Sequence, residues 1–439
     1  MEETLDKHLV SRYSAYKDSE VEWLGEIPEH WASLSNKHIF KLKKNLVGKK
    51  SSDYDLLSLT LRGVIKRVLE DGGKFPTEFD TYQEVKKGDF IFCLFDVEET
   101  PRCVGLSKFD GMITGAYTVF GVNSNFDKGY LYYFYLNLDA DKRLKPLYTG
   151  LRNTISKDNF FSFKTYNPPL PEQKAIAEFL DKKTALIDQA ISIKEKQITL
   201  LKERRQILIH QAVTRGLDPH VKLKDSGVEW IGMIPEGWEM KPLRVLGFTQ
   251  NGISRGGDYF GSGFPFVSYG DVYNNIQLPD HGSGLANSSD SDRIQYSVRK
   301  GDVFFTRTSE TAEEIGFAST CLATISDSVF SGFLIRFRPT SEKLDSGFSK
   351  YYFSSYTHRN FFVKEMNLVI RASLSQDLLK RMPVLLPPIE EQKSISAFIE
   401  NSEAKVLKSI SLKEQEIEKL KEFKATLINS AVTGKIKVN

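Results

Sequence analysis

Basic and polar side chains that could contact nucleic acid occur in both halves of the chain. Arg62, Lys66 and Arg67 form a basic cluster in the first half. Arginine and lysine can donate hydrogen bonds to guanine or neutralise phosphate, so the cluster is a candidate nucleic-acid contact. A solvated helix face would give the same pattern, and both interpretations stay open. The candidates in the second half are polar residues in turn-like segments or beside a predicted strand, namely Arg255, Tyr269, Asn274, Asn275, Arg307 and Thr308.

Two further arginines occupy matching places. Arg152 lies in segment 151–158 and Arg371 in the similar segment 370–377. A basic residue present in both copies favours a shared role, either structural or as a phosphate contact, over the choice of a base.

Segment 167–170, Asn-Pro-Pro-Leu, resembles the Asn-Pro-Pro-aromatic loop of amino-methyltransferases. However, the aromatic residue is missing, and the corresponding segment 386–389 begins with leucine instead of asparagine. No glycine-rich cofactor loop follows a predicted strand. We therefore interpret 167–170 as a connector between a domain and a helix, and expect no catalytic residue in the chain.

Cofactor and metal sites are not expected either. The glycine-rich segment 252–263 lacks the Gly-Lys-Ser/Thr ending of a phosphate-binding P-loop, so it is either a flexible loop over nucleic acid or an ordinary surface loop. The three cysteines and seven histidines have no metal-ligand spacing.

Length and composition are those of a multidomain globular protein. The 439 residues predict roughly two to four domains. The N-terminus lacks an apolar segment, the cysteines form no paired framework and no long apolar run is present, so we expect a cytoplasmic protein without a membrane span. The net charge of +3 neither indicates nor excludes nucleic acid, because a local basic face is enough.

Two long apolar heptad patterns must position these candidates. The first begins after Pro169 and the second after Pro388, and matching residues lie 219 positions apart, as Gln173 and Gln392 do. Steps of three and four residues place the apolar side chains on one helical stripe. The predicted stripe consists of Ile187, Ile191, Ile198, Leu201 and Leu208 in the first copy and of Val406, Ile410, Ile417, Leu420 and Leu427 in the second.

A tryptophan-containing element is also repeated. Trp23 and Trp31 return 207 positions later as Trp230 and Trp238. We interpret these four residues as packing residues that fix each domain to its helix, in preference to a partner-binding role.

The repeats predict a tandem duplication of an α+β domain that is followed by a long helix. Between the tryptophan elements and the helices, short β-rich runs alternate with turn signals, and 130–138 is a helix or a strand. The predicted segments are 1–168 for the first domain, 169–215 for the first helix, 216–386 for the second domain and 387–439 for the second helix.

The two heptad helices are natural partners for each other. We expect them to pack antiparallel as a coiled coil, which would give a pseudo-two-fold axis. The alternative is that each stripe packs only on its own domain. Basic residues interrupt the stripe, and we expect them to extend their charges to solvent or to pair with glutamate; they are Lys194, Arg205, Lys413 and Lys424.

At this point the residues resemble a known family, the DNA-specificity subunits of Type I restriction–modification systems. The motifs are the two tryptophan elements, the two Pro-Pro-Leu/Ile-x-Glu-Gln-Lys helix starts and the two Ala-Val-Thr helix ends. Segment 95–117, which contains Arg102, also resembles one class of the family's recognition domains. Each motif is weak alone, but their duplication in the same order is specific and covers essentially the whole chain.

The resemblance implies a non-enzymatic subunit with two target-recognition domains, each reading one half of a bipartite, asymmetric site on double-stranded DNA. It implies that the paired helices act as a spacer on which two methyltransferase subunits dock, and that restriction subunits join this core. S-adenosylmethionine, ATP and Mg are then expected on the partner subunits and none in this chain. The predicted stripe of about 38 Å is close to the ~34–36 Å of one DNA turn.

Two rival functions remain. One is a methyltransferase or nuclease that acts alone, which the missing cofactor loop disfavours. The other is a coiled-coil scaffold without DNA binding, which salt-sensitive binding of specific duplex DNA would exclude.

Overall fold

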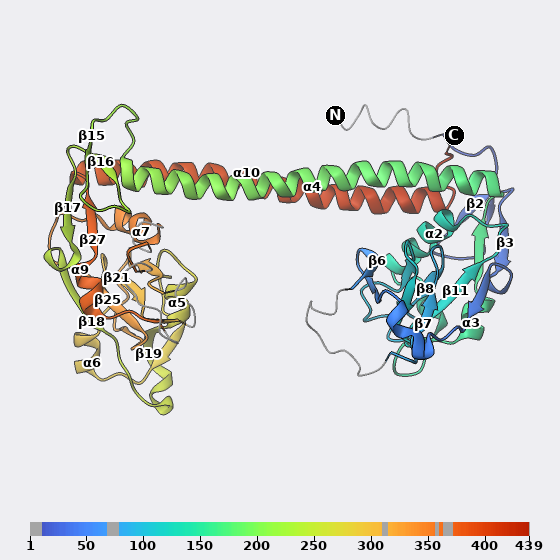
Figure 1. The fold of residues 1–439 in the computed structure, drawn as a ribbon, viewed down its shortest axis with the longest axis horizontal. Helices are drawn as coiled ribbons and strands as arrows, with labels where there is room; N and C mark the ends of the chain where they lie inside the picture. The colour runs from blue at the N-terminus through green and yellow to red at the C-terminus, as the bar shows by residue number, and fades with distance from the viewer. Residues whose placement is uncertain (1–10, 68–78, 310–314, 356–359, 363–371, 439) are drawn as a thin grey trace. The chain divides into compact units, whose positions relative to one another are not determined.

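The computed structural model describes residues 11–67, 79–309, 315–355, 360–362 and 372–438. The chain divides into two compact units. Unit 1 comprises Met1–Lys194 and Glu414–Asn439, and unit 2 comprises Glu195–Lys413. The division falls inside both long helices, α4 (Leu170–Arg215) and α10 (Ile389–Val432), so that each unit contains part of both (Figure 1).

A four-stranded antiparallel sheet is the centre of unit 1. Its strand order is β4 (Phe40–Lys43), β11 (Thr118–Val122), β8 (Phe90–Phe92) and β9 (Val104–Leu106). Both faces are covered, because successive side chains of a strand point to opposite sides. Phe92 packs with Phe40 and Phe160 on one face, while Ile91 joins a second apolar cluster on the other.

The helix α2 (Lys128–Ala140) packs between this sheet and the long helices of unit 1. The alternative of a strand at 130–138 is therefore excluded. Asp127 caps the helix, because its carboxylate accepts a hydrogen bond from the Tyr130 backbone N–H at 2.9 Å. Tyr130, Phe134 and Leu138 are completely buried, and apolar residues continue around the helix. A helix that is apolar on all sides has no clear period, which explains the ambiguity in the sequence.

Short strand pairs surround the sheet of unit 1. They are β1 (Tyr16–Asp18) with β2 (Glu26–Pro28), β3 (Ala32–Ser35) with β14 (Lys164–Asn167), β5 (Leu57–Thr60) with β6 (Gly63–Lys66), β7 (Gln83–Val85) with β10 (Gly111–Ile113), and β12 (Tyr148–Thr149) with β13 (Thr154–Ile155). The helix α3 (Lys157–Ser162) and the 3-10 turns η1 (Asn36–His38), η2 (Gly48–Asp53) and η3 (Lys145–Leu147) complete the described part of this unit.

Unit 2 contains a four-stranded antiparallel sheet with the corresponding order. The strands are β18 (Gly247–Asn251), β25 (Leu334–Pro339), β21 (Val303–Thr306) and β23 (Ala318–Thr320). The helix α7 (Ser346–Ser354) is its counterpart of α2, with Asp345 as the cap. A second sheet joins β20 (Gly284–Ala286), β19 (Phe260–Val267) and β24 (Val329–Phe330) and has no equivalent among the described sheets of unit 1.

The remaining elements of unit 2 are short. The strand pairs are β15 (Leu223–Asp225) with β16 (Met233–Pro235), β17 (Glu239–Pro242) with β27 (Pro383–Leu386), and β22 (Thr308–Ser309) with β26 (Ala372–Ser373). The helices are α5 (Tyr269–Tyr273), α6 (Asp290–Gln295) and α9 (Gln376–Arg381), with 3-10 turns η4 (Leu243–Val245) and η5 (Gly257–Tyr259).

The repeated Lys-Gly-Asp segments form the turns that enter the central strands β8 and β21. Gly88 and Gly301 have φ of +87° and +91°, a left-handed conformation that favours glycine. The following aspartate is buried and is held by a cation of the same sheet. Asp89 pairs with Lys43 at 2.8 Å, and Asp302 pairs with Arg338 at 2.6 Å. The repeated segment therefore has a structural role in both units.

The second long helix ends at Val432, because Gly434 adopts a left-handed φ of +74° that stops it. The described residues of segment 387–439 that follow Val432 are therefore not helical. The chain then runs back along the N-terminal segment, where the Lys437 N–H donates to the Ser11 carbonyl at 2.8 Å. Within the described ranges, the helices lack the combination of length and apolar character that crossing a lipid bilayer would require.

Candidate nucleic-acid interface

A contact to the half-buried Glu172 fixes the α+β domain of unit 1 to α4. The Glu172 carboxylate accepts hydrogen bonds from Tyr13 Oη at 2.6 Å and Trp31 Nε1 at 3.1 Å, and it lies 2.7 Å from His30 Nε2. Burial and the hydrogen bond to Glu172 raise the pKa of Tyr13. Trp31 itself is only 1% exposed.

Unit 2 repeats this contact in a reduced form. Trp238 Nε1 donates to Glu391 Oε2 at 3.1 Å, but Gly237 stands where unit 1 has His30. Trp31 and Trp238 are therefore confirmed as packing residues. Trp23 and Trp230 are half-buried and pack against Arg143 and Phe361, respectively.

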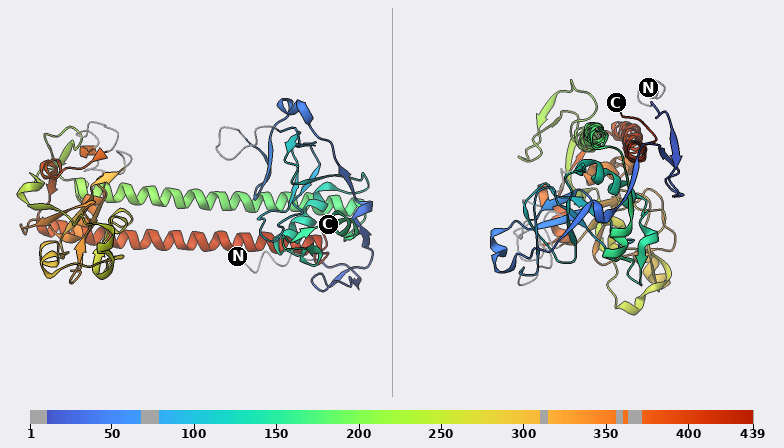
Figure 2. Two further views of the ribbon diagram at one scale, coloured as in Figure 1. Left: turned by 90° about the horizontal axis from the view of Figure 1, so that it is seen from below. Right: turned by 90° about the vertical axis from the view of Figure 1, so that its right-hand side faces the viewer.

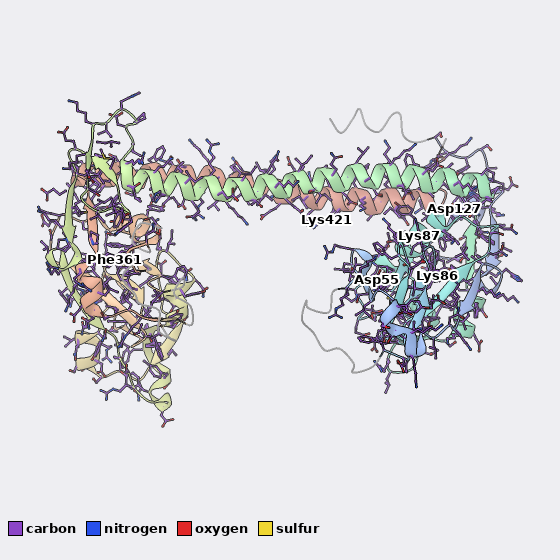
Figure 3. All side chains as sticks on the ribbon, viewed as in Figure 1. Asp55, Lys86, Lys87, Asp127, Phe361 and Lys421 are labelled. Atoms are coloured by element: carbon purple, nitrogen blue, oxygen red, sulfur yellow. The ribbon has the colours of Figure 1, made fainter. Side chains whose placement is uncertain are left out.

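The glutamine of each helix start has a specific task. Gln173 Oε1 accepts from the Asp127 N–H at 2.8 Å, and Gln392 Oε1 accepts from the Asp345 N–H at the same distance. Asp127 and Asp345 are the caps of α2 and α7, so each glutamine ties the first turn of a domain helix to a long helix. Figure 3 labels Asp127 beside the long helices. Asp127 and Asp345 were not predicted as functional residues, although their nearly constant offset from the glutamines is visible in the sequence.

In unit 1 the residues of the predicted stripe are shielded from solvent. Ile187, Ile417 and Leu427 are less than 10% exposed, and Ile191 and Leu420 are half-buried. Lys424 pairs with Asp188 at 2.6 Å and Lys194 with Glu416 at 2.5 Å. Because the numbers fall along α10 as they rise along α4, the helices run antiparallel here (Figure 2).

In unit 2 the other half of the stripe is also shielded. Ile410 is 7% exposed, and the four remaining members are half-buried, namely Ile198, Leu201, Leu208 and Val406. Arg205 Nε donates to Glu403 Oε1 at 2.7 Å, and Glu403 also accepts from Tyr351 Oη at 2.8 Å. Lys194 and Arg205 thus pair with glutamate, as predicted, whereas the partner of Lys424 is aspartate.

The outward faces of α4 carry exposed apolar residues. Leu186 and Ile193 in unit 1 are 61% and 48% exposed, and Leu200 and Ile207 in unit 2 are 62% and 56% exposed. Their spacing of seven residues gives them a common helical angle. In the described structure these side chains are not part of the seam.

Arg62, Lys66 and Arg67 lie together on the β5–β6 hairpin of unit 1. Arg62 is in the exposed tip beside Leu61, which is 65% exposed. Lys66 pairs with Asp55 at 2.6 Å, and Figure 3 labels Asp55 on this hairpin's side of the domain. The cluster therefore belongs to a strand hairpin, and the alternative prediction of a solvated helix face is wrong.

Arg102 and Arg152 have carboxylate partners. Arg102 Nη1 lies 3.5 Å from the buried Asp139, and Arg102 Nη2 donates to the Leu61 carbonyl at 3.4 Å. Arg152 Nε donates to Asp96 Oδ1 at 3.0 Å, and this hydrogen bond lowers the pKa of Asp96. Arg102 thus stabilises the hairpin tip through the Leu61 carbonyl, whereas the guanidinium of Arg152 is exposed and could also bind phosphate.

Five candidates of unit 2 lie on or beside α5 and β22. Tyr269, Asn274 and Asn275 lie on or just after α5, and Tyr269 Oη donates to the Thr308 carbonyl at 3.1 Å. Thr308 is exposed at the start of β22, directly after the half-buried Arg307.

Arg255 lies exposed in a separate loop between β18 and η5. This loop is anchored at its start, because a Cβ on Gly252 would meet the Ser331 carbonyl oxygen at 2.2 Å. Arg371 lies outside the described residues.

The remaining residues that could do chemistry lie in surroundings that indicate a structural role. Asn167 is buried, and its Nδ2 donates to the Ala32 carbonyl at 3.3 Å; α4 starts three residues later, so the segment is confirmed as a connector. Burial raises the pKa of Cys103 and of Cys321 to about 12, so neither thiol is a nucleophile at neutral pH. Among the described residues no group of three or more potential metal ligands occurs.

The sequence matches a known family and several of its members. Residues 108–203 and 235–422 match the family described as Type I restriction modification DNA specificity domain. A Methanocaldococcus jannaschii protein, provisionally named the type I restriction enzyme MjaX specificity subunit, is 27% identical over 94% of this chain and 96% of its own length. The type I restriction enzyme EcoKI specificity subunit of Escherichia coli is 24% identical over 86% of this chain and 82% of its own length.

Solved structures share the fold. The HsdS subunit from Thermoanaerobacter tengcongensis superposes with a TM-score of 0.54 at 14% identity, over 93% of this chain and 98% of that one. A chain from a structure of the type I R-M system superposes with a TM-score of 0.65 at 14% identity, over 92% of this chain and 98% of that one. The family match covers more than half of the sequence, and the chain therefore belongs to the type I restriction–modification DNA specificity family, as a specificity subunit that recognises DNA and is not itself an enzyme.

Proposed function

We propose that this subunit reads a bipartite, asymmetric DNA site, with one half-site contacted by each unit. One observation carries the proposal: the central sheets of the two units have the same strand order, while the polar loops around them differ. A shared frame with different contact surfaces is what two readers of different sequences require.

The surfaces that would read DNA differ in kind. Unit 1 offers an exposed hairpin tip with Arg62 and Lys66, whose cations suit guanine or phosphate. Unit 2 offers amide, hydroxyl and aromatic groups around α5 and β22. Arg102, Arg152, Arg255 and Arg371 stay candidate contacts, with Arg152 and Arg255 exposed.

We infer further that the chain is a tandem duplication whose two long helices pair antiparallel along their length, with pseudo-two-fold symmetry. The ion pairs between α4 and α10 within each unit support this. Paired helices of this length would act as a spacer between the two reading domains.

The same helices would carry the catalytic partners. The exposed apolar residues on the outer faces of α4 suit docking of two methyltransferase subunits, and restriction subunits would join this assembly. S-adenosylmethionine, ATP and Mg would then bind to the partner subunits.

The test is to co-express the chain with a methyltransferase subunit of its own system and to map methylated bases genome-wide. The expected result is one asymmetric motif of two short half-sites with an unspecified spacer. Methylation at a single continuous motif would contradict two-part reading. Methyl transfer by the isolated chain would favour the rival function of a methyltransferase that acts alone.

A further inference from the structure

The short helix α5 is held rigidly in unit 2. The buried Asp271 carboxylate accepts four hydrogen bonds, from the backbone N–H and hydroxyl of Ser268 and of Ser283, at 2.8–3.1 Å. Val272 is 1% exposed in the apolar cluster below. Asp271 and Val272 thus fix the position of α5, and the residues that directly follow the helix are held in place with it.

Asn274 and Asn275 follow α5 with their side-chain amides in defined orientations. Asn274 Nδ2 donates to the Gly270 carbonyl and Asn275 Nδ2 to the Asp271 carbonyl, both at 3.0 Å. A carbonyl can only accept, so these bonds settle which amide atom is nitrogen. Each amide has two N–H groups and one oxygen. Within the described part of the chain, the second N–H and Oδ1 of each amide remain for a ligand, and both side chains are exposed.

Both amides line one small cavity of about 270 Å³. Its aromatic lining includes Tyr273 and Phe317, whose ring centroids are 5.0 Å apart. Gln206 of α4 supplies a third amide to the same cavity. The cavity lining thus offers a planar ligand both an apolar surface, from the rings, and hydrogen-bond donors and acceptors, from the amides.

We propose that Asn274 and Asn275 select an adenine in the half-site read by unit 2. Adenine presents an acceptor, N7, beside a donor, the N6 amino group, in the major groove, and an asparagine amide matches both at once. Guanine presents two acceptors there, so one of them would face Oδ1. Cytosine offers a single donor. This inference rests on the proposed function, since it assumes that unit 2 reads DNA.

The first experiment leaves the protein unchanged. The complex with its methyltransferase subunit binds duplexes in which 7-deazaadenine replaces each adenine of the mapped site in turn, which removes only the N7 acceptor. One position should bind roughly 5- to 100-fold more weakly, as expected for the loss of a specific base contact. Equal binding of all substituted duplexes would overturn the inference.

The second experiment assigns that position to the amides. In the Asn274→Ala and Asn275→Ala double variant, the methylated motif should become degenerate at the same adenine, and the deaza substitution should no longer weaken binding. Asn287→Ala, another exposed asparagine of unit 2, is the matched control and should leave the motif unchanged. A double variant that still requires adenine at every original position would overturn the inference.

The two proposals fail in distinguishable ways. If the unchanged protein directs no bipartite methylation, the proposed function is wrong. If bipartite methylation occurs but neither the deaza scan nor the double variant affects a single adenine, only the assignment of Asn274 and Asn275 is wrong.

Discussion

At the scale of single residues, the matching glutamates of the two long helices differ in the number of hydrogen bonds they accept. Glu172 has three side-chain partners, Tyr13, His30 and Trp31, whereas Glu391 accepts a side-chain hydrogen bond from Trp238. Hydrogen bonds to a charged acceptor are stronger than neutral ones. The first copy therefore depends more on its glutamate.

Glu172→Gln should lower the free energy of unfolding of unit 1 by about 2 kcal/mol, because a neutral amide replaces a charge-assisted acceptor. Glu391→Gln should cost unit 2 less, about 1 kcal/mol. Hydrogen exchange can measure each unit separately. Glu178→Gln, an exposed position on α4, serves as the control, and equal losses in all three variants would contradict this account.

A buried phenol makes unit 2 sensitive to alkaline pH. Burial first, and then the hydrogen bond to Glu403, raises the pKa of Tyr351 above the ordinary value of 10.0. Below pH 10 both states keep the proton and the stability is complete. Above it the unfolded chain loses the proton that the folded chain retains, so stability falls with rising pH.

At pH 11 this difference should amount to roughly 1 kcal/mol for Tyr351. Tyr351→Phe should be less stable at pH 8, since it lacks the hydrogen bond, but should lose less between pH 8 and pH 11 than the unchanged protein. Denaturant titrations at both pH values measure this. Parallel losses in the two proteins would show that Tyr351 does not titrate as described.

At the scale of elements, burial separates two kinds of apolar residue on the same helix of unit 2. Ile410 is 7% exposed in the seam, while Leu412 is 50% exposed. Ile410→Ala should destabilise unit 2 by about 2–4 kcal/mol, because it leaves a cavity, whereas Leu412→Ala should cost less than about 1 kcal/mol. Thermal unfolding compares them. A larger effect for Leu412→Ala would show that Leu412, and not Ile410, lies in the buried seam.

The elements also show what could be predicted from the sequence. The stripe was predictable because a heptad is a local pattern, and all ten predicted members are buried or half-buried. The hairpin with Arg62 was not, because Leu57 and Val64 are buried only through contacts with distant strands. Likewise, the role of Arg102 depends on Asp139, 37 positions away, and no spacing rule links the two.

The DNA contacts are the least predictable part for a related reason. Sequence patterns identify residue types that can bind bases, but orientation decides which of them do. Asn274 and Asn275 are oriented by carbonyls of α5, and Arg152 by Asp96. These constraints appear only once the backbone is known.

At the scale of the whole molecule, the proposed spacer makes a quantitative prediction. Inserting one heptad into both α4 and α10 preserves the seam, because seven residues restore the same helical face. The insertion lengthens each helix by about 10 Å at 1.5 Å per residue. Since DNA rises about 3.4 Å per base pair, the unspecified spacer of the methylated motif should grow by about three base pairs. Both half-sites should stay the same, because neither recognition domain is altered.

Methylome mapping of the doubly extended chain, co-expressed with its methyltransferase subunit, checks this spacing. The matched control inserts the heptad into α4 alone, between Lys196 and Gln197. Because α10 is then seven residues too short, apolar residues of the seam on α4 no longer have apolar partners on α10. We expect loss of stability and of methylation rather than a longer spacer. If the doubly extended chain methylates the original motif with an unchanged spacer, the helices do not set the distance between half-sites, and the separation must be determined by the partner subunits instead.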